Sequence, residues 1–114
     1  MGGAAGKSRC NLARPFDRHG RRRVERDRGR RAADRARLKP GDQALDICCG
    51  TGDIAIELAG RVGPSGAVTG SDFSRPMLEL AAGKARADGI SQVEFEWADA
   101  LELPYEDNTF DALT

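Results

Sequence analysis

Two glycines and two carboxylates stand at spacings that suit the binding of a charged small molecule. Asp46 ends a short apolar run and is followed by the turn Gly50-Thr51-Gly52, after which an apolar helical pattern begins. Glycines let a backbone turn sharply and leave no side chain between it and a ligand. Asp72 comes twenty residues after Gly52, where a carboxylate can accept hydrogen bonds from ribose hydroxyls. The pattern predicts the first half of a nucleoside-binding unit.

The charge around the turn bears on which nucleoside binds. Asp46 precedes the turn and Asp53 closes it. A pyrophosphate favours helix N-terminal amides without anions nearby, so these carboxylates disfavour a dinucleotide. They suit a ligand with an ammonium group and a sulfonium cation, and S-adenosylmethionine has both, with a ribose for Asp72. The same glycine spacing fits the dinucleotide fingerprint, so a nicotinamide-dependent oxidoreductase half-domain remains an alternative.

Three stretches resemble known proteins: LDICCGTGD at residues 45–53, VGPSGAVTGSDFS at 62–74 and DALELPYEDNTFDALT at 99–114. They are similar to class I S-adenosylmethionine-dependent methyltransferases. More narrowly, they resemble the menaquinone/ubiquinone C-methyltransferase family, whose members methylate prenylated quinone precursors on a ring carbon. The double cysteine before the glycine turn and the run LPYEDNTFD are the narrowing features. The resemblance covers about residues 38–114.

The resemblance implies a set of residues that hold the cofactor. It matches Thr51, Asp72 and the pair Asp99-Ala100 to cofactor-contacting positions, and it places Asp46 near the methionine ammonium. The carboxylate of Asp99 would accept from the adenine amine, and the small Ala100 would leave room for the ring. Each aspartate could instead be an ordinary turn or capping residue. The predicted S-adenosylmethionine site comprises Asp46, Gly50, Thr51, Gly52, Asp72, Asp99 and Ala100.

The implied substrate is a prenylated quinone precursor such as demethylmenaquinone, whose lipophilic tail implies peripheral contact with a membrane. The groups that would activate the ring are expected beyond Thr114 or in the divergent N-terminal region, so we predict no catalytic residue. We predict no metal site, because zinc ligands are spaced two to four residues apart with further ligands, and Cys48 and Cys49 are adjacent. The other candidates, Cys10 and His19, lie in the N-terminal segment.

The expected fold is α/β, a Rossmann-like class I methyltransferase fold with a parallel sheet and flanking helices. Residues 39–114 would be the N-terminal half of this domain. We expect the fourth strand to begin just before Thr114, and we expect the 114-residue protein alone to have no methyltransferase activity. Strands are predicted at about 43–48, 67–71 and 93–97, and helices after Asp53 and Ser74 as capping residues. The alternation in VEFEW at 93–97 predicts an edge strand.

The net charge of zero hides a split. Residues 1–40 carry 14 Lys and Arg against 4 Asp and Glu, and residues 41–114 carry 4 against 14. We expect residues 1–38 to be an Arg-rich, disordered or degraded segment, with Gly20 and Gly29 interrupting any helix. Such a segment suggests nucleic acid or an anionic surface as a partner. A basic-tailed nucleic-acid-binding protein is therefore the non-enzyme alternative, although no aromatics interleave the arginines.

The sequence also bears on the compartment. No apolar run is long enough to span a membrane, and the N-terminus lacks the apolar core of a secretory signal. The adjacent cysteines Cys48 and Cys49 are poorly placed for a structural disulfide and are expected to stay reduced. We therefore expect a cytoplasmic protein.

Overall fold

The computed structural model describes residues 23–114, with side chains from residue 28 onward. Our expectations for residues 1–22, which include Cys10, His19 and Gly20, lie outside this range. The helices are α2 (Arg23–Ala36), α3 (Asp53–Val62) and α4 (Arg75–Ala87), and the strands are β1 (Gln43–Ile47), β2 (Ala67–Asp72), β3 (Val93–Trp97) and β4 (Ala112–Leu113).

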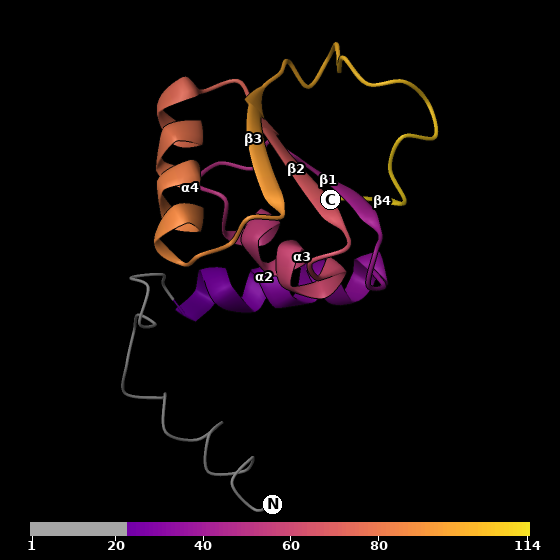
Figure 1. Cartoon of the computed structure of the whole chain (residues 1–114). Coiled ribbons are helices and arrows are strands. Elements are labelled where there is room, and N and C mark those ends of the chain that lie inside the picture. The colour runs from indigo at the N-terminus through magenta and orange to yellow at the C-terminus, as the bar shows by residue number, and fades with distance from the viewer. Residues whose placement is uncertain (1–22) are drawn as a thin grey trace, which may run out of the picture.

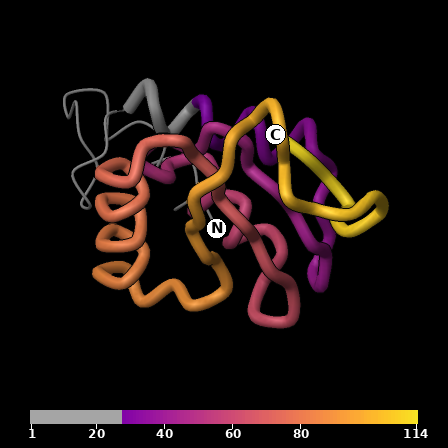
Figure 2. Tube along the Cα trace, turned by 90° about the horizontal axis from the view of Figure 1, so that it is seen from above, coloured from indigo at the N-terminus to yellow at the C-terminus, as the bar shows by residue number. Residues whose placement is uncertain are grey.

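The strands form one parallel sheet in the order β3-β2-β1-β4 (Figure 1). Two β-helix-β connections run through α3 and α4. The segment between β3 and β4 then crosses to the far side of β1, as the yellow end of the chain shows in Figure 2. The predicted parallel sheet with flanking helices is confirmed, as is the edge position of β3.

The main core lies between the sheet and α3. Ala44, Val68 and Val93 stand side by side on neighbouring strands, and all three are buried. They meet the apolar face of α3, whose buried residues are Ala55, Ile56, Leu58, Ala59 and Val62. The apolar spacing predicts Ile54, Ile56, Leu58, Ala59 and Val62 on this face; the last four are buried, whereas Ile54 is half-buried and Ala55 takes a buried position.

A helix occupies much of the segment that we expected to lack regular structure. α2 spans Arg23–Ala36, and Gly29 lies inside it without interrupting it. The reason is packing: Gly29 is buried against α3, where an ideal Cβ would lie at contact distance, 3.4 Å, from Cβ of Glu57. Ala33, which is 1% exposed, belongs to the core. Small residues hold this helix in place where large apolar ones are missing.

Of the two capping residues predicted at helix starts, the structure confirms one and contradicts the other. Ser74 caps α4, and its hydroxyl accepts from the Met77 amide at 3.5 Å. Asp53, in contrast, does not cap α3: Gly52 holds that position in the left-handed conformation, with no side-chain cap. Asp53 is the first helical residue, and its carboxylate pairs with Lys84 of α4 at 2.9 Å. It thus joins the two helices.

Three large apolar side chains near the sheet edge and on α4 are exposed. Met77 and Leu80 on α4 are 41% and 58% exposed, and Trp97 at the end of β3 is 40% exposed. The inner face of α4 is narrower than its apolar composition suggests and comprises Leu78, Ala81 and Ala85. Trp97 borders the open edge, where its indole donates to the Phe73 carbonyl at 2.8 Å. Across residues 23–114, no helix has the length and apolar character to cross a membrane.

Candidate functional site

Asp46 and Asp72 lie near the carboxyl ends of the neighbouring strands β1 and β2. Parallel α/β sheets bind ligands at this end of their strands. The loop after β1 is tied to the end of β2, because the Cys49 amide donates to the Ser71 carbonyl at 2.8 Å. The structure therefore brings the glycine turn beside Asp72, as the sequence spacing predicted.

The carboxylate of Asp72 organises the backbone around it. Its Oδ2 accepts from the Gly50 amide at 2.9 Å, and its Oδ1 accepts from the Ser74 amide at 2.8 Å. Two bonds from opposite sides fix the side chain in one orientation. They also hold the glycine turn against the start of α4. A carboxylate oxygen can accept more than one bond, so capacity for a ligand remains.

The carboxylate of Asp46 is in a different condition. The residue is only 3% exposed, and Oδ1 accepts from the Thr114 hydroxyl at 2.9 Å. Oδ2 is buried without a hydrogen-bond partner. Burial raises the pKa of Asp46, and the charge of Asp72 adds to the rise, while Thr114 and the Ala55 amide oppose it. A buried carboxylate with an unpartnered oxygen is a group that a cationic ligand would stabilise.

The two glycines of the turn have different tasks. Both have left-handed backbone, with φ of 56° at Gly50 and 87° at Gly52. An ideal Cβ at Gly52 would lie 2.8 Å from Cβ of Ala81, so this glycine is required for packing against α4. A Cβ at Gly50 would meet nothing within 4 Å, so open space adjoins the backbone there. Gly50 thus borders the space that a ligand could occupy.

The remaining predicted positions are less enclosed. Thr51 is half-buried and Ala100 is exposed. Asp99 follows β3, and its Oδ1 accepts from the Leu101 amide at 2.9 Å, which is an ordinary turn contact. The preceding Ala98 amide donates to the Asp72 carbonyl at 3.1 Å, so the segment before Asp99 is joined to the end of β2.

Sequence reasoning missed Thr114 and Tyr105. Thr114 reaches Asp46 because β4 lies beside β1, and its amide donates to the Leu45 carbonyl at 2.9 Å. The Tyr105 hydroxyl is buried near Glu96 without a bond of ordinary geometry. Burial and the nearby Glu96 charge raise the pKa of Tyr105 to about 12. Only the order of the strands could have indicated the first contact.

The adjacent cysteines differ in exposure. Cys48 is exposed, whereas Cys49 is buried, and burial with the nearby Asp46 and Asp72 charges raises its pKa to about 12. The Cys49 thiol therefore stays protonated and packs beneath the turn. Within residues 23–114, no group of three or more His, Cys, Asp or Glu side chains could hold a metal ion.

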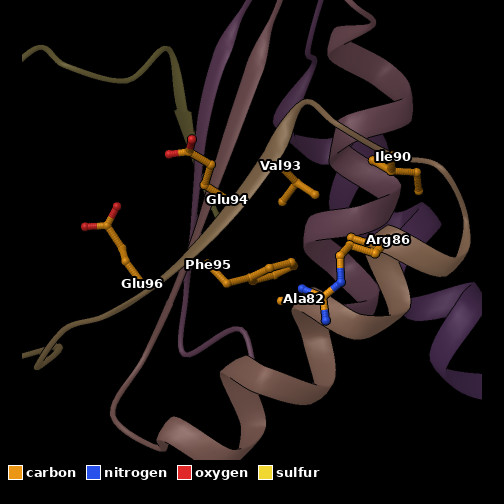
Figure 3. Close-up of a pocket in the computed structure, with 8 residues that line it drawn as sticks. Ala82, Arg86, Ile90, Val93, Glu94, Phe95 and Glu96 are labelled. Atoms are coloured by element: carbon orange, nitrogen blue, oxygen red, sulfur yellow. The ribbon is translucent and has the colours of Figure 1, made fainter.

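A groove of about 350 Å³ lies elsewhere, between α4 and the edge strand β3. In Figure 3, Phe95 and Arg86 point into it, whereas Glu94 and Glu96 point away. Its lining comprises Ala82, Ala85, Arg86, Ile90, Val93, Glu94, Phe95 and Glu96. None of the predicted cofactor-site residues lines this groove, so it is separate from the strand-end site.

Solved structures share this fold. The [4+2]-cyclase SpnF has a TM-score of 0.69 with 37% identity, over 77% of this chain and 32% of that one. A SAM-dependent methyltransferase from Aquifex aeolicus has a TM-score of 0.67 with 28% identity, over 77% of this chain and 47% of that one. The Rossmann-like methyltransferase fold is confirmed. Because one of these proteins is a cyclase, the fold alone does not fix the reaction.

Sequence comparisons give the family. The demethylmenaquinone methyltransferase of Bacillus cytotoxicus is 53% identical over 77 residues, which are 68% of this chain and 32% of that protein. This chain thus spans about a third of the length of the curated relatives that it matches. The ubiE/COQ5 methyltransferase family matches residues 22–114, a range that includes α2. The chain belongs to the ubiE/COQ5 methyltransferase family.

Proposed function

We propose that this chain is the N-terminal part of an S-adenosylmethionine-dependent methyltransferase that methylates a ring carbon of a prenylated quinone precursor. The observation that carries the proposal is the buried Asp46 carboxylate, whose Oδ2 has no partner, beside a glycine turn that borders open space at Gly50. This arrangement suits a cation-bearing cofactor better than a dinucleotide, because a pyrophosphate would be repelled by the carboxylates.

The residues present fit the cofactor by their chemistry. Asp46 would stabilise the methionine ammonium, the open backbone at Gly50 would admit the cofactor, and Asp72 would accept from the ribose hydroxyls. Asp99 and Ala100 would lie beside the adenine. The support for these roles is the position of all of them at or after strand ends, with Asp72 already oriented by two amides. The proposed contact set is Asp46, Gly50, Thr51, Gly52, Asp72, Asp99 and Ala100.

The chain's own residues would contribute binding and orientation. When bound, the cofactor supplies a methyl group on a sulfonium, which makes that carbon electrophilic. The turn and the paired amides of Asp72 hold their positions before the ligand arrives, which lowers the entropy lost on binding. We assign no residue of 23–114 to activating the quinol ring.

The substrate is proposed from the relatives. Those at 53–54% identity are named demethylmenaquinone methyltransferases, so we propose demethylmenaquinol or a similar prenylated quinol as the acceptor. Residues 39–114 would form the N-terminal half of the cofactor-binding domain, with α2 packed against it. We propose the cytoplasm as the compartment, which suits the free cysteines Cys48 and Cys49.

Calorimetry on the completed domain tests the cofactor. By completed domain we mean this chain extended to the length of its curated relatives with the remaining part of the Bacillus cytotoxicus protein. We expect S-adenosylhomocysteine to bind more tightly than NAD. Tighter binding of NAD would overturn the cofactor assignment. Methyl transfer to demethylmenaquinol then tests the substrate, and transfer only to an unprenylated acceptor would overturn that part alone.

A further inference from the structure

The outer face of α2 carries a stripe of arginines. Arg28, Arg31 and Arg35 are exposed and lie three and four residues apart, so they share one side of the helix. The opposite side contacts α3 through Gly29 and the buried Ala33. The helix therefore has one side that packs through small residues and another that presents positive charge to solvent.

Among the side chains that the structure describes, none cancels the positive charge of this face through an ion pair. From residue 28 onward, α2 has one carboxylate, Asp34, which is exposed and already paired with Arg61 of α3 at 2.7 Å. Among the described residues, no acidic side chain forms an ion pair with the three arginines of the stripe. The described stretch 28–39 carries six Lys and Arg against one Asp, whereas residues 41–114 carry an excess of ten acidic groups. The described part of residues 28–39 is thus basic, whereas residues 41–114 are acidic overall.

The position of α2 leaves this face accessible. α2 lies along the side of α3 that faces away from the sheet (Figure 1). An ideal Cβ at Gly29 would lie 3.5 Å from the Asp53 carbonyl, so this part of α2 adjoins the first turn of α3. That turn begins directly after the glycine loop. A surface bound by the arginines would therefore lie across α2 from the first turn of α3.

We propose that the arginine face of α2, formed by Arg28, Arg31 and Arg35, docks onto an anionic lipid bilayer. The inference rests on the proposed function, because a prenylated quinol resides in the bilayer and its enzyme must reach it there. Anionic bilayers attract clustered Lys and Arg through their surface potential. Nucleic acid is the less favoured partner, because α2 has no aromatic residue to stack on a base. The acidic remainder would be repelled and would orient the molecule with α2 toward the lipid.

Vesicle sedimentation tests this directly. The 114-residue chain is mixed with phosphatidylglycerol or phosphatidylcholine vesicles, without cofactor or quinol. We expect binding to the anionic vesicles alone, and its loss at high salt. The double variant Arg31→Gln/Arg35→Gln should bind about 30-fold more weakly, since each basic group near the surface strengthens binding roughly fivefold. The control Arg75→Gln/Arg86→Gln removes the same charge from α4 and should bind as the wild type does. Circular dichroism checks that both variants fold.

Each other outcome overturns the proposal. Equal binding to both vesicle types, or no binding to either, would exclude an anionic bilayer as the partner. Equal weakening in both double variants would show that net charge acts without the α2 face. Tighter binding to a duplex RNA, lost in Arg31→Gln/Arg35→Gln, would assign the face to nucleic acid. Because neither cofactor nor acceptor is present, vesicle binding can fail while methyl transfer stands, and the reverse.

Discussion

The ends of β1 and β2 carry the same side chain and use it differently. Both carboxylate oxygens of Asp72 accept hydrogen bonds from backbone amides, those of Gly50 and Ser74. Asp46 has one hydrogen bond of ordinary geometry, from Thr114, and by the same criterion its second oxygen is buried without a partner. The pKa of Asp46 is raised by burial. One strand end therefore has a satisfied carboxylate and the other an unsatisfied one.

The two aspartates therefore differ in what their carboxylates do in the folded protein: Asp72 orders the backbone of the site, whereas Asp46 has an oxygen free for a ligand. The paired oxygens of Asp72 connect the glycine turn to the start of α4, so its charge contributes to the folded structure. The buried charge of Asp46 opposes folding, because desolvation disfavours the ionised form. Such a group is retained at functional sites at the expense of stability. The proposed function gives it a reason: a cationic ligand would supply the missing partner.

The largest expected effect comes from closing the space between the two strand ends. Gly50→Val should abolish binding of S-adenosylhomocysteine to the completed domain, because the side chain would enter the open space beside the turn. Valine would also be strained at a φ of 56°. Thr51→Ser, which keeps the hydroxyl, is the matched control and should bind nearly as the wild type does. Calorimetry measures both, and near-normal affinity in Gly50→Val would show that the turn is not the binding loop.

Asp72→Ala should weaken binding of S-adenosylhomocysteine by about 1.5–3 kcal/mol, the usual scale for hydrogen bonds to a charged group. The variant loses the proposed ribose acceptor and leaves the Gly50 and Ser74 amides without their carboxylate. Asp107→Ala removes an equal charge from an exposed loop position and should bind normally. An unchanged dissociation constant in a folded Asp72→Ala protein would exclude the ribose role.

The turn and its acid were predictable because they depend on local spacing. Glycines at 50 and 52 and an acid at 72 mark a β-helix-β unit, and the structure has one. The edge position of β3 was likewise predictable from its alternation. Such features are fixed by a few neighbouring residues, so they need no knowledge of distant contacts.

The features that the sequence analysis predicted wrongly or missed depend on contacts between distant segments. Gly29 has low helix propensity, yet close packing against α3 outweighs it. Asp53 was expected to cap its own helix and instead pairs with Lys84, which is 31 residues away. The bond from Thr114 to Asp46 spans 68 residues and requires that β4 lie beside β1. Whether an aspartate is paired thus depends on topology, which single-sequence patterns do not supply.

Removing the Thr114 hydroxyl should leave both oxygens of Asp46 without a hydrogen-bond donor of ordinary geometry, in contrast to Asp72. Thr114→Val should lower the stability of the completed domain by about 1–2 kcal/mol near neutral pH, because the carboxylate loses its hydroxyl donor. The same bond lowers the pKa of Asp46, so its loss should raise that pKa further. Thr109→Val is the control, since the Thr109 hydroxyl donates at 2.6 Å to an uncharged acceptor, the backbone carbonyl of Glu106, on an exposed loop. Urea denaturation should show a smaller loss of stability in Thr109→Val than in Thr114→Val. Equal losses would contradict the claim that the buried carboxylate of Asp46 depends on its hydroxyl donor.

The smallest effect is expected for Asp46→Asn, because two terms oppose each other. The neutral amide removes the buried charge, which stabilises the fold, but its NH₂ group would replace the oxygen that has no partner. An unsatisfied buried donor costs about 1–3 kcal/mol, so the net change should be under about 1 kcal/mol at acid pH. Binding of S-adenosylhomocysteine should nevertheless weaken, because the charge that would attract its ammonium is gone. Tighter binding would contradict the proposed role of Asp46.

The pH dependence of this variant separates the two terms. The folded-state pKa of Asp46 lies above its ordinary value of 3.8, so above that pH the folded state holds more protons than the unfolded state. The stability of the wild type therefore loses a contribution as pH rises from 3.8 through the raised pKa. Asp46→Asn lacks this loss, so its stability relative to the wild type should increase over that window and then level off. Urea denaturation between about pH 4 and about pH 8 measures the difference, with Asp107→Asn as the exposed control. A difference that stays constant with pH would mean that folding does not raise the pKa of Asp46.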